Sequence, residues 1–142
     1  MTALGTKSEI DSVWQEWLAR RNLKALPWGV LAVILLYPTF LILDRLMIER
    51  PLIPSFTIIR LSVTGLAIGI LVLGRQQIAR KSHILLTAAL TLITADGIAL
   101  MVALMGQAGH PYYAGITLVI IGAGLIFLWP PLVTVGVYAS IL

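Results

Sequence analysis

Residues 84–105 read ILLTAALTLITADGIALMVALM and contain a single ionisable side chain, that of Asp96. A helix needs about 20 mostly apolar residues to cross a hydrocarbon core of about 30 Å, and this stretch has that length. The chain as a whole is 59% hydrophobic and 11% charged, whereas soluble domains carry roughly 45–50% apolar and about 25% charged residues. The sequence therefore predicts an integral membrane protein.

Further apolar stretches lie on both sides, and we expect transmembrane spans at about 28–47, 56–73, 84–105 and 113–129. A last apolar segment, 131–142, would form roughly 18 Å of helix, which is too short to cross the core. It is either a half-span packed against its neighbours or the start of a longer helix. The predicted fold class is an all-α membrane bundle with an N-terminal amphipathic interfacial helix, four transmembrane helices and a partial fifth.

Basic residues predict the orientation of this bundle. Seven of the ten lie in the N-terminal arm or in the 75–83 loop, and three lie on the opposite side of the membrane. The first group is Lys7, Arg20, Arg21, Lys24, Arg75, Arg80 and Lys81, and the second is Arg45, Arg50 and Arg60. The positive-inside rule then places the N-terminus in the cytoplasm and the 107–112 loop outside. Because the bases lie between apolar runs, nucleic-acid binding is excluded.

Residues 1–27 are expected to form a cytoplasmic amphipathic arm, with 28–142 as the transmembrane bundle. Apolar residues from Ile10 to Leu18, including Trp14 and Trp17, recur at the spacing of one helical stripe. We predict a helix that ends near Asn22, lies in the membrane interface and joins the first span at Pro27. It is either an anchor or a coupling and dimer-contact helix. Interfacial anchors are expected at Trp14, Trp17, Trp28 and Trp129.

Asp96 is the principal candidate for a ligand contact or switch, because a carboxyl in the middle of a span must be neutral, paired or turned inward. Arg60 is a possible ion-pair partner, and Tyr37 is an alternative hydrogen-bond donor. The competing interpretation is that Asp96 holds helices together without a further role. Additional ligand candidates lie in or beside the external turn, namely His110, Tyr112 and Tyr113, although His110 beside Pro111 also fits a simple turn residue.

The sequence contains no catalytic constellation. It has no HExxH, GxSxG or Walker lysine motif, and it has no cysteine. The two histidines, His83 and His110, are expected on opposite sides of the membrane, where they cannot share a metal or haem. We therefore expect no enzymatic activity, no metal and no cofactor.

Small residues mark two helix-packing faces. Ser62, Gly65 and Gly69 repeat every three or four residues in the second span, and Gly115 and Gly122 lie seven apart in the fourth. Such spacing lets two helix backbones approach closely. Packing within the bundle is the first expectation, and contact between two copies is the second.

Residues 110–119 read HPYYAGITLV, followed by a glycine-rich apolar helix and Trp129-Pro130-Pro131. This run resembles the Pro-Tyr-Tyr-Ala-Gly segment of the six-helix membrane sensor regions that precede bacterial histidine kinases and class III adenylate cyclases. The resemblance covers about residues 25–142, with His110 where that family has serine. It implies a membrane-anchoring sensor and dimerisation region whose output domain lies outside this chain.

The partners expected on this basis are the lipid bilayer and a second copy of the chain or a larger membrane complex, with an unidentified ligand. An alternative from another class is a small accessory subunit of a larger membrane complex, with no signalling role.

Overall fold

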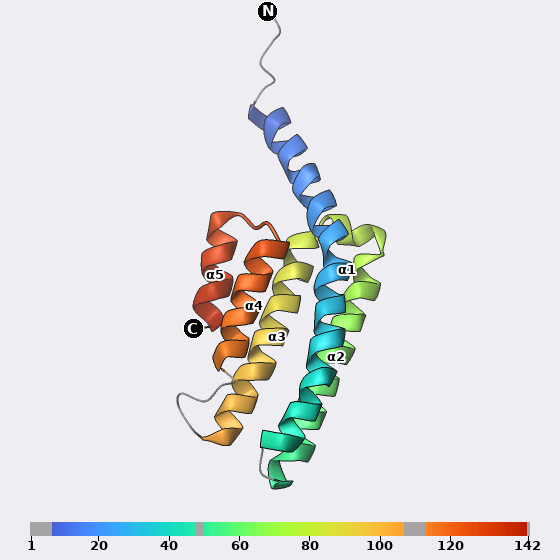
Figure 1. Ribbon diagram of the computed structural model, residues 1–142. Helices are drawn as coiled ribbons and strands as arrows, with labels where there is room; N and C mark the ends of the chain where they lie inside the picture. The colour runs from blue at the N-terminus through green and yellow to red at the C-terminus, as the bar shows by residue number, and fades with distance from the viewer. Residues whose placement is uncertain (1–6, 48–49, 107–112, 142) are drawn as a thin grey trace, which may run out of the picture.

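The computed structural model describes residues 7–47, 50–106 and 113–141. All regular secondary structure in these residues is helical, which confirms the predicted all-α class. The helices are α1 (Lys7–Met47), α2 (Ile53–Gly74), α3 (His83–Met105), α4 (Tyr113–Ile126) and α5 (Pro131–Ile141), with short 3-10 helices η1 (Arg50–Leu52) and η2 (Gln77–Arg80). They run alternately up and down in one bundle (Figure 1). We call the end with η2 the basic end and the other the Asp44 end.

Helices α1, α2 and α3 are long and apolar enough to cross a membrane. Helix α4 is not, because it has 14 residues and a length of about 21 Å. The predicted fourth span, 113–129, is therefore wrong at its end. The chain leaves the helix after Ile126, and Pro131 occupies the first turn of α5, where a missing N–H leaves no helical hydrogen bond unmade.

The N-terminal arm is not a separate helix, so the predicted end near Asn22 is wrong. Helix α1 runs unbroken through Pro27 and Pro38 over 41 residues, a length of about 60 Å. Its buried positions explain why. Leu18, Asn22, Leu26 and Val30 are all nearly inaccessible and lie four residues apart, so they form a single stripe on one helix face. Since that stripe packs on both sides of Pro27, tertiary contacts keep the helix continuous there. Its N-terminal turns project beyond the bundle (Figure 1).

Helix α3 is the centre of the bundle and contacts the other four helices. Close approach to its neighbours depends on Gly97, because a Cβ atom there would lie 2.7 Å from Val63 Cγ2 and 3.0 Å from the Tyr37 hydroxyl. The helix ends at Gly106, whose φ of 64° is the left-handed conformation that terminates many helices.

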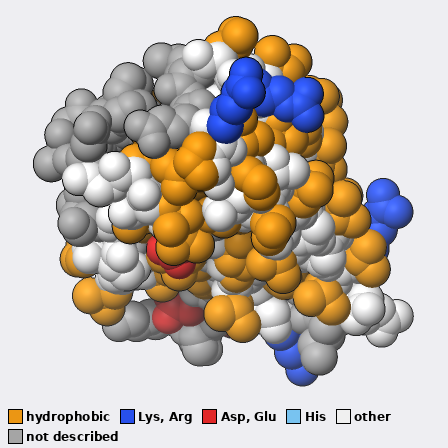
Figure 2. Space-filling view, turned by 90° about the horizontal axis from the view of Figure 1, so that it is seen from below, with side chains coloured by type: hydrophobic (Ala, Val, Ile, Leu, Met, Phe, Trp, Pro, Cys, Tyr) orange, Lys and Arg blue, Asp and Glu red, His pale blue; other side chains and the backbone are white. Residues whose placement is uncertain are grey.

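Much of the outer surface of the bundle is apolar. Large hydrophobic side chains are exposed along the bundle, among them Leu31, Leu35, Ile58, Leu61, Leu66 and Leu100. Viewed from the Asp44 end, hydrophobic side chains are spread across the described part of the face, and basic groups lie nearer its edges (Figure 2). A protein that is apolar both inside and outside is compatible with a lipid bilayer as its solvent.

Candidate ligand pocket and buried polar cluster

A fully buried ion pair joins α1 to α2 near the Asp44 end. Arg60 Nε donates to Asp44 Oδ2 at 2.6 Å, and Arg60 Nη2 donates to Asp44 Oδ1 at 2.9 Å. The two side chains are 3% and 1% exposed. Two parallel hydrogen bonds of this kind fix both the direction and the distance of the guanidinium. The pair therefore sets how α1 and α2 face each other near the Asp44 end.

Two aromatic rings from α1 enclose the guanidinium. The Arg60 Cζ atom lies 5.6 Å from the centre of the Tyr37 ring and 5.5 Å from that of Phe40, within the range of a cation–π contact. The Tyr37 hydroxyl donates to the backbone carbonyl of Thr94 on α3. Because Tyr37 contacts both Arg60 and Thr94, the polar cluster spans α1, α2 and α3.

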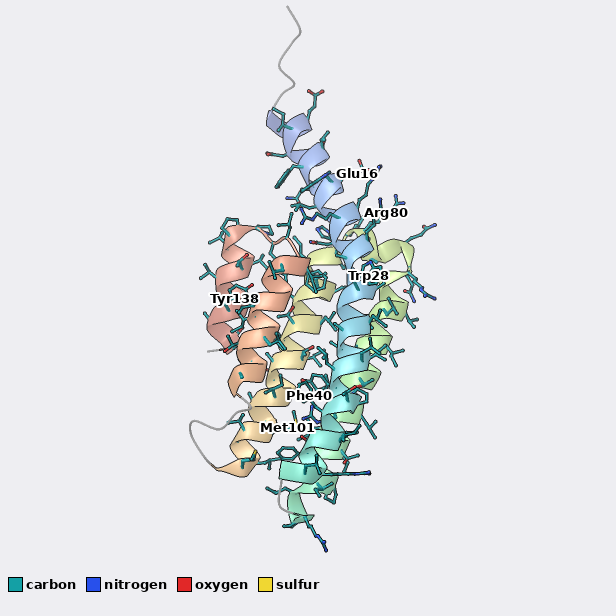
Figure 3. All side chains as sticks on the ribbon, viewed as in Figure 1. Glu16, Trp28, Phe40, Arg80, Met101 and Tyr138 are labelled. Atoms are coloured by element: carbon teal, nitrogen blue, oxygen red, sulfur yellow. The ribbon has the colours of Figure 1, made fainter. Side chains whose placement is uncertain are left out.

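The cluster forms one end of an apolar pocket of about 480 Å³ between α1, α3 and α4. Ligand sites in proteins occupy about 300–1,000 Å³, so this volume is sufficient for a small molecule or a hydrocarbon chain. The pocket extends along α1 from Gly29 to Phe40, a distance of about 16 Å at 1.5 Å per residue. Phe40 on α1 and Met101 on α3 lie at about the same level, in the part of the pocket nearer the Asp44 end (Figure 3).

The polar groups that line this pocket make hydrogen bonds within the protein. Thr91 Oγ1 donates to the carbonyl of Thr87 at 3.0 Å, and Thr94 Oγ1 donates to that of Leu90 at 2.6 Å. Tyr37 and Arg60 are engaged as described above. A molecule in the pocket therefore meets mainly aliphatic and aromatic surface, which favours an occupant with few polar groups.

The basic end of the pocket is closed by tight packing around Phe127. A Cβ atom on Gly29 would lie 2.8 Å from Phe127 Cζ and 3.3 Å from Leu90 Cδ2, so a larger residue there would require the Phe127 ring to shift. Phe127 stacks on Trp129 with ring centres 6.0 Å apart, and Trp129 Nε1 donates to Thr87 Oγ1 at 2.8 Å. This packing holds the 127–130 connection against α1 and α3.

Asp96, the principal candidate from the sequence, is not the partner of Arg60. Its residue is exposed on α3, while the adjacent Gly97 faces Tyr37 and Val63. Arg60, the suggested ion-pair partner of Asp96, pairs with Asp44 instead. The structure thus brings Arg60 and Tyr37 together as candidates and places Asp96 beside them, near enough to Tyr37 for an electrostatic interaction.

Sequence reasoning missed Asp44. A detectable pattern was present, because Asp44 lies one turn before the end of the first apolar run and Arg60 lies early in the second. Two helices joined by a short connection are antiparallel neighbours, so opposite charges near their joined ends can pair. Asn22 was missed as a site residue for a similar reason, since its partner, Leu128, is distant in the sequence.

The small-residue faces have different surroundings. Ser62, Gly65 and Gly69 lie on an exposed face of α2, and a Cβ atom on either glycine would meet nothing within 4 Å. Packing of this stripe within the bundle, the first expectation, is therefore not found. Gly115 does pack inside, where a Cβ atom would lie 3.3 Å from Ile98 Cδ1, whereas Gly122 has open space and lines the pocket.

The aromatic candidates also differ in their exposure. Trp14, Trp17 and Trp28 are exposed on α1, and Trp129 is half-buried in the packing around Phe127. Tyr113 is the first residue of α4. His110 and Tyr112 lie outside the described residues.

Within the three described segments, no group of three His, Cys, Asp or Glu side chains could hold a metal ion. Comparisons with models of known protein families, with curated proteins and with solved structures find no match for this chain.

Proposed function

We propose that this chain is the membrane-anchoring sensor and dimerisation region of a bacterial signalling enzyme, a cyclase or histidine kinase, and that its stimulus is a lipophilic molecule bound between α1, α3 and α4. The proposal includes insertion in the inner membrane with the N-terminus in the cytoplasm, an orientation supported by the distribution of basic residues. The observation that carries it is the apolar pocket of about 480 Å³ with a buried ion pair at one end.

The shape and lining of the pocket favour a hydrocarbon chain. It is elongated, its polar groups already make internal hydrogen bonds, and its apolar walls come from α1, α3 and α4. A bound chain would add contacts between α1 and α4, which share few contacts with each other. A ligand shifts a conformational equilibrium only by the difference in its affinity for the two states, and closure of α4 on α1 is a movement that such contacts would favour.

Photo-crosslinking tests the pocket directly. Palmitic acid carrying a diazirine in mid-chain would be added to the purified chain in lipid nanodiscs, and the labelled residues mapped by mass spectrometry. We expect saturable labelling of Leu36 and Leu118, which line the pocket, and non-saturable labelling of Leu66 on the outer face of α2. Labelling that is non-saturable at all three positions would contradict a binding site.

Two glycine variants provide a matched pair for this experiment. Gly122→Leu would add a side chain at a residue that lines the pocket, where a Cβ atom meets nothing within 4 Å. Gly136→Leu adds the same side chain at an equally open glycine on α5 that does not line the pocket. Only Gly122→Leu is expected to suppress saturable labelling.

Dimerisation is proposed through the outer face of α2. Ser62, Gly65 and Gly69 are small, exposed residues on that face, and a Cβ atom on either glycine would meet nothing within 4 Å. Such a face suits close approach of a second helix. The association constant in lipid, measured by energy transfer between labelled chains, should fall in Gly65→Leu and Gly69→Leu and not in Gly136→Leu. A wild-type chain that stays monomeric at high protein-to-lipid ratio would rule out self-association.

The accessory-subunit alternative has support from α1, whose N-terminal turns project beyond the bundle with Trp14 and Trp17 exposed. The gene sequence beyond codon 142 separates the two functions. An in-frame linker and catalytic domain would support the sensor, and a stop codon together with co-purification of a large complex would support the subunit.

A further inference from the structure

A second pocket, of about 370 Å³, lies at the basic end between α1 and the connection that contains η2. Three basic side chains line it, those of Arg20, Arg80 and Lys81, and one acidic side chain, that of Glu16. Glu16 accepts a hydrogen bond from Arg20 at 2.6 Å, and both side chains of that pair are largely exposed. Figure 3 shows Glu16 and Arg80 at this same end of the molecule. The pocket therefore has a net positive lining.

His83, the first residue of α3, also lines this pocket. The residue is 5% exposed, and its Nε2 has no hydrogen-bond partner among the residues that the structure describes. Buried polar atoms in proteins nearly always have a partner, because an unpaired one costs about 1–3 kcal/mol. A polar ligand in this pocket would supply the hydrogen bond that the Nε2 nitrogen of this lining residue lacks within the described residues.

The hydrogen bond of the other ring nitrogen, Nδ1, determines whether Nε2 donates or accepts. Nδ1 lies 3.1 Å from the backbone carbonyl of Arg80, and a carbonyl oxygen only accepts, so Nδ1 carries a proton and donates. In the neutral ring Nε2 then accepts a hydrogen bond, for example from a P–OH group. In the protonated ring it donates to a phosphate oxygen. Either form of contact suits a phosphate group.

The level of the pocket along α1 matches a lipid headgroup. Leu23, which lines the pocket, precedes the exposed Trp28 by about 7 Å along the helix. Tryptophan is enriched at the boundary between hydrocarbon and headgroups. Basic pockets between transmembrane helices on the cytoplasmic side are typical binding sites for acidic lipid headgroups.

We propose that the pocket formed by α1, η2 and the start of α3 binds a phosphate group, carried by a phospholipid headgroup or by a soluble phosphate. Arg80 and Lys81 supply the positive charge, and His83 Nε2 supplies the buried hydrogen bond. This site is at the opposite end of the bundle from the Asp44–Arg60 pair and does not depend on the sensor function proposed above.

Native mass spectrometry of the full chain in detergent tests the site with two probes that differ only in the phosphate. Dioleoyl phosphatidic acid should bind saturably, and dioleoylglycerol, which has the same acyl chains, should not. Addition of inorganic phosphate distinguishes the two sources. Displacement of the lipid by millimolar phosphate would assign the pocket to a soluble phosphate as well, and retention of the lipid would assign it to the headgroup. Equal binding of the two lipids would overturn the proposal.

Arg80→Gln and Arg75→Gln form a matched pair, because each removes one exposed charge from the same end of the bundle and only Arg80 lines the pocket. The Arg80 change leaves the contact to His83 intact, since that contact uses the backbone carbonyl. We expect phosphatidic acid to bind about tenfold more weakly to Arg80→Gln, which corresponds to about 1.4 kcal/mol, and within twofold of wild type to Arg75→Gln. Equal weakening by both changes would indicate only general attraction to a basic surface and would overturn the site.

His83→Asn separates a binding role from a structural one. Asparagine can keep a polar atom near the Nδ1 position and has none at the Nε2 position. We expect this variant to lose affinity for phosphatidic acid while its helix content and melting temperature in detergent stay at wild-type values. Unchanged affinity in a folded His83→Asn would remove His83 from the proposal and, with it, the buried contact on which the site rests.

Discussion

Asn22 and Leu128 lie 106 residues apart and are joined by two hydrogen bonds of opposite direction. Asn22 Nδ2 donates to the Leu128 carbonyl at 2.8 Å, and the Leu128 N–H donates to Asn22 Oδ1 at 3.0 Å. The asparagine is fully buried. Its amide thus satisfies both backbone groups of a residue that has left α4, and it ties α1 to the connection between α4 and α5.

We expect Asn22→Ala to destabilise the chain by about 1–3 kcal/mol for each Leu128 group that loses its partner without access to water. The free energy of unfolding can be measured by titration with sodium dodecyl sulfate in mixed micelles. Gln76→Ala is the control, because Gln76 is an exposed amide at the same end of the bundle. A similar small effect of both changes would show that the Asn22 pair does not stabilise the fold.

The Asp44–Arg60 pair should obey the energetics of buried ion pairs. Removing one partner takes the ion pair away from a charge that stays buried in an apolar interior, which typically costs about 3–5 kcal/mol. Arg60→Met should therefore be strongly destabilising in the same titration. The double variant Asp44→Leu with Arg60→Met should be more stable than Arg60→Met alone, because it leaves no buried charge.

Asp96→Asn is the matched control for this experiment. Asp96 is also a carboxylate in an apolar helix, and its side chain is exposed rather than buried. The asparagine amide has nearly the size of the carboxyl and keeps its ability to form hydrogen bonds, so we expect a much smaller change in unfolding free energy than for Arg60→Met. Strong destabilisation by Asp96→Asn would mean that the carboxyl has a structural partner.

The helices could be predicted from the sequence because their apolar runs are long and end at turn-forming residues. Gly106, Pro130 and Pro131 lie where α3 ends and α5 begins, as expected from the backbone preferences of glycine and proline. The continuity of α1 could not be predicted in this way. Proline at position 27 is typical of a helix start. The buried stripe that runs from Leu18 to Leu26 and on to Val30, past the proline, explains why the same helix continues.

The candidate site was less predictable than the fold. Asp96 was prominent because it interrupts an apolar run, yet which face of α3 it occupies depends on how α1, α2 and α4 pack around that helix. The partner of Arg60 likewise depends on the pairing of α1 with α2. The pocket itself has no sequence signature, since its lining residues are ordinary apolar residues drawn from separate helices.

Gly97 and Gly65 should respond oppositely to the same change. A Cβ atom on Gly97 would approach Val63 Cγ2 to 2.7 Å, whereas one on Gly65 would meet nothing within 4 Å. Overpacking a close helix contact costs about 1–3 kcal/mol, so Gly97→Ala should lower the free energy of unfolding by that amount. Gly65→Ala should be neutral or stabilising, since alanine favours helix over glycine. A neutral Gly97→Ala would contradict the close approach of α3 to α2.

The orientation in the membrane leads to a labelling experiment in a chain that has no cysteine of its own. Gln76 is exposed in the connection at the basic end, and Gln107 follows the last turn of α3 in the sequence, directly after Gly106. If the basic end faces the cytoplasm, an impermeant maleimide applied to intact spheroplasts should label Gln107→Cys and spare Gln76→Cys. Permeabilised cells supply the control, since both positions should then react. Labelling of Gln76→Cys alone in intact spheroplasts would invert the orientation, and the basic pocket beside His83 would then face the outer leaflet.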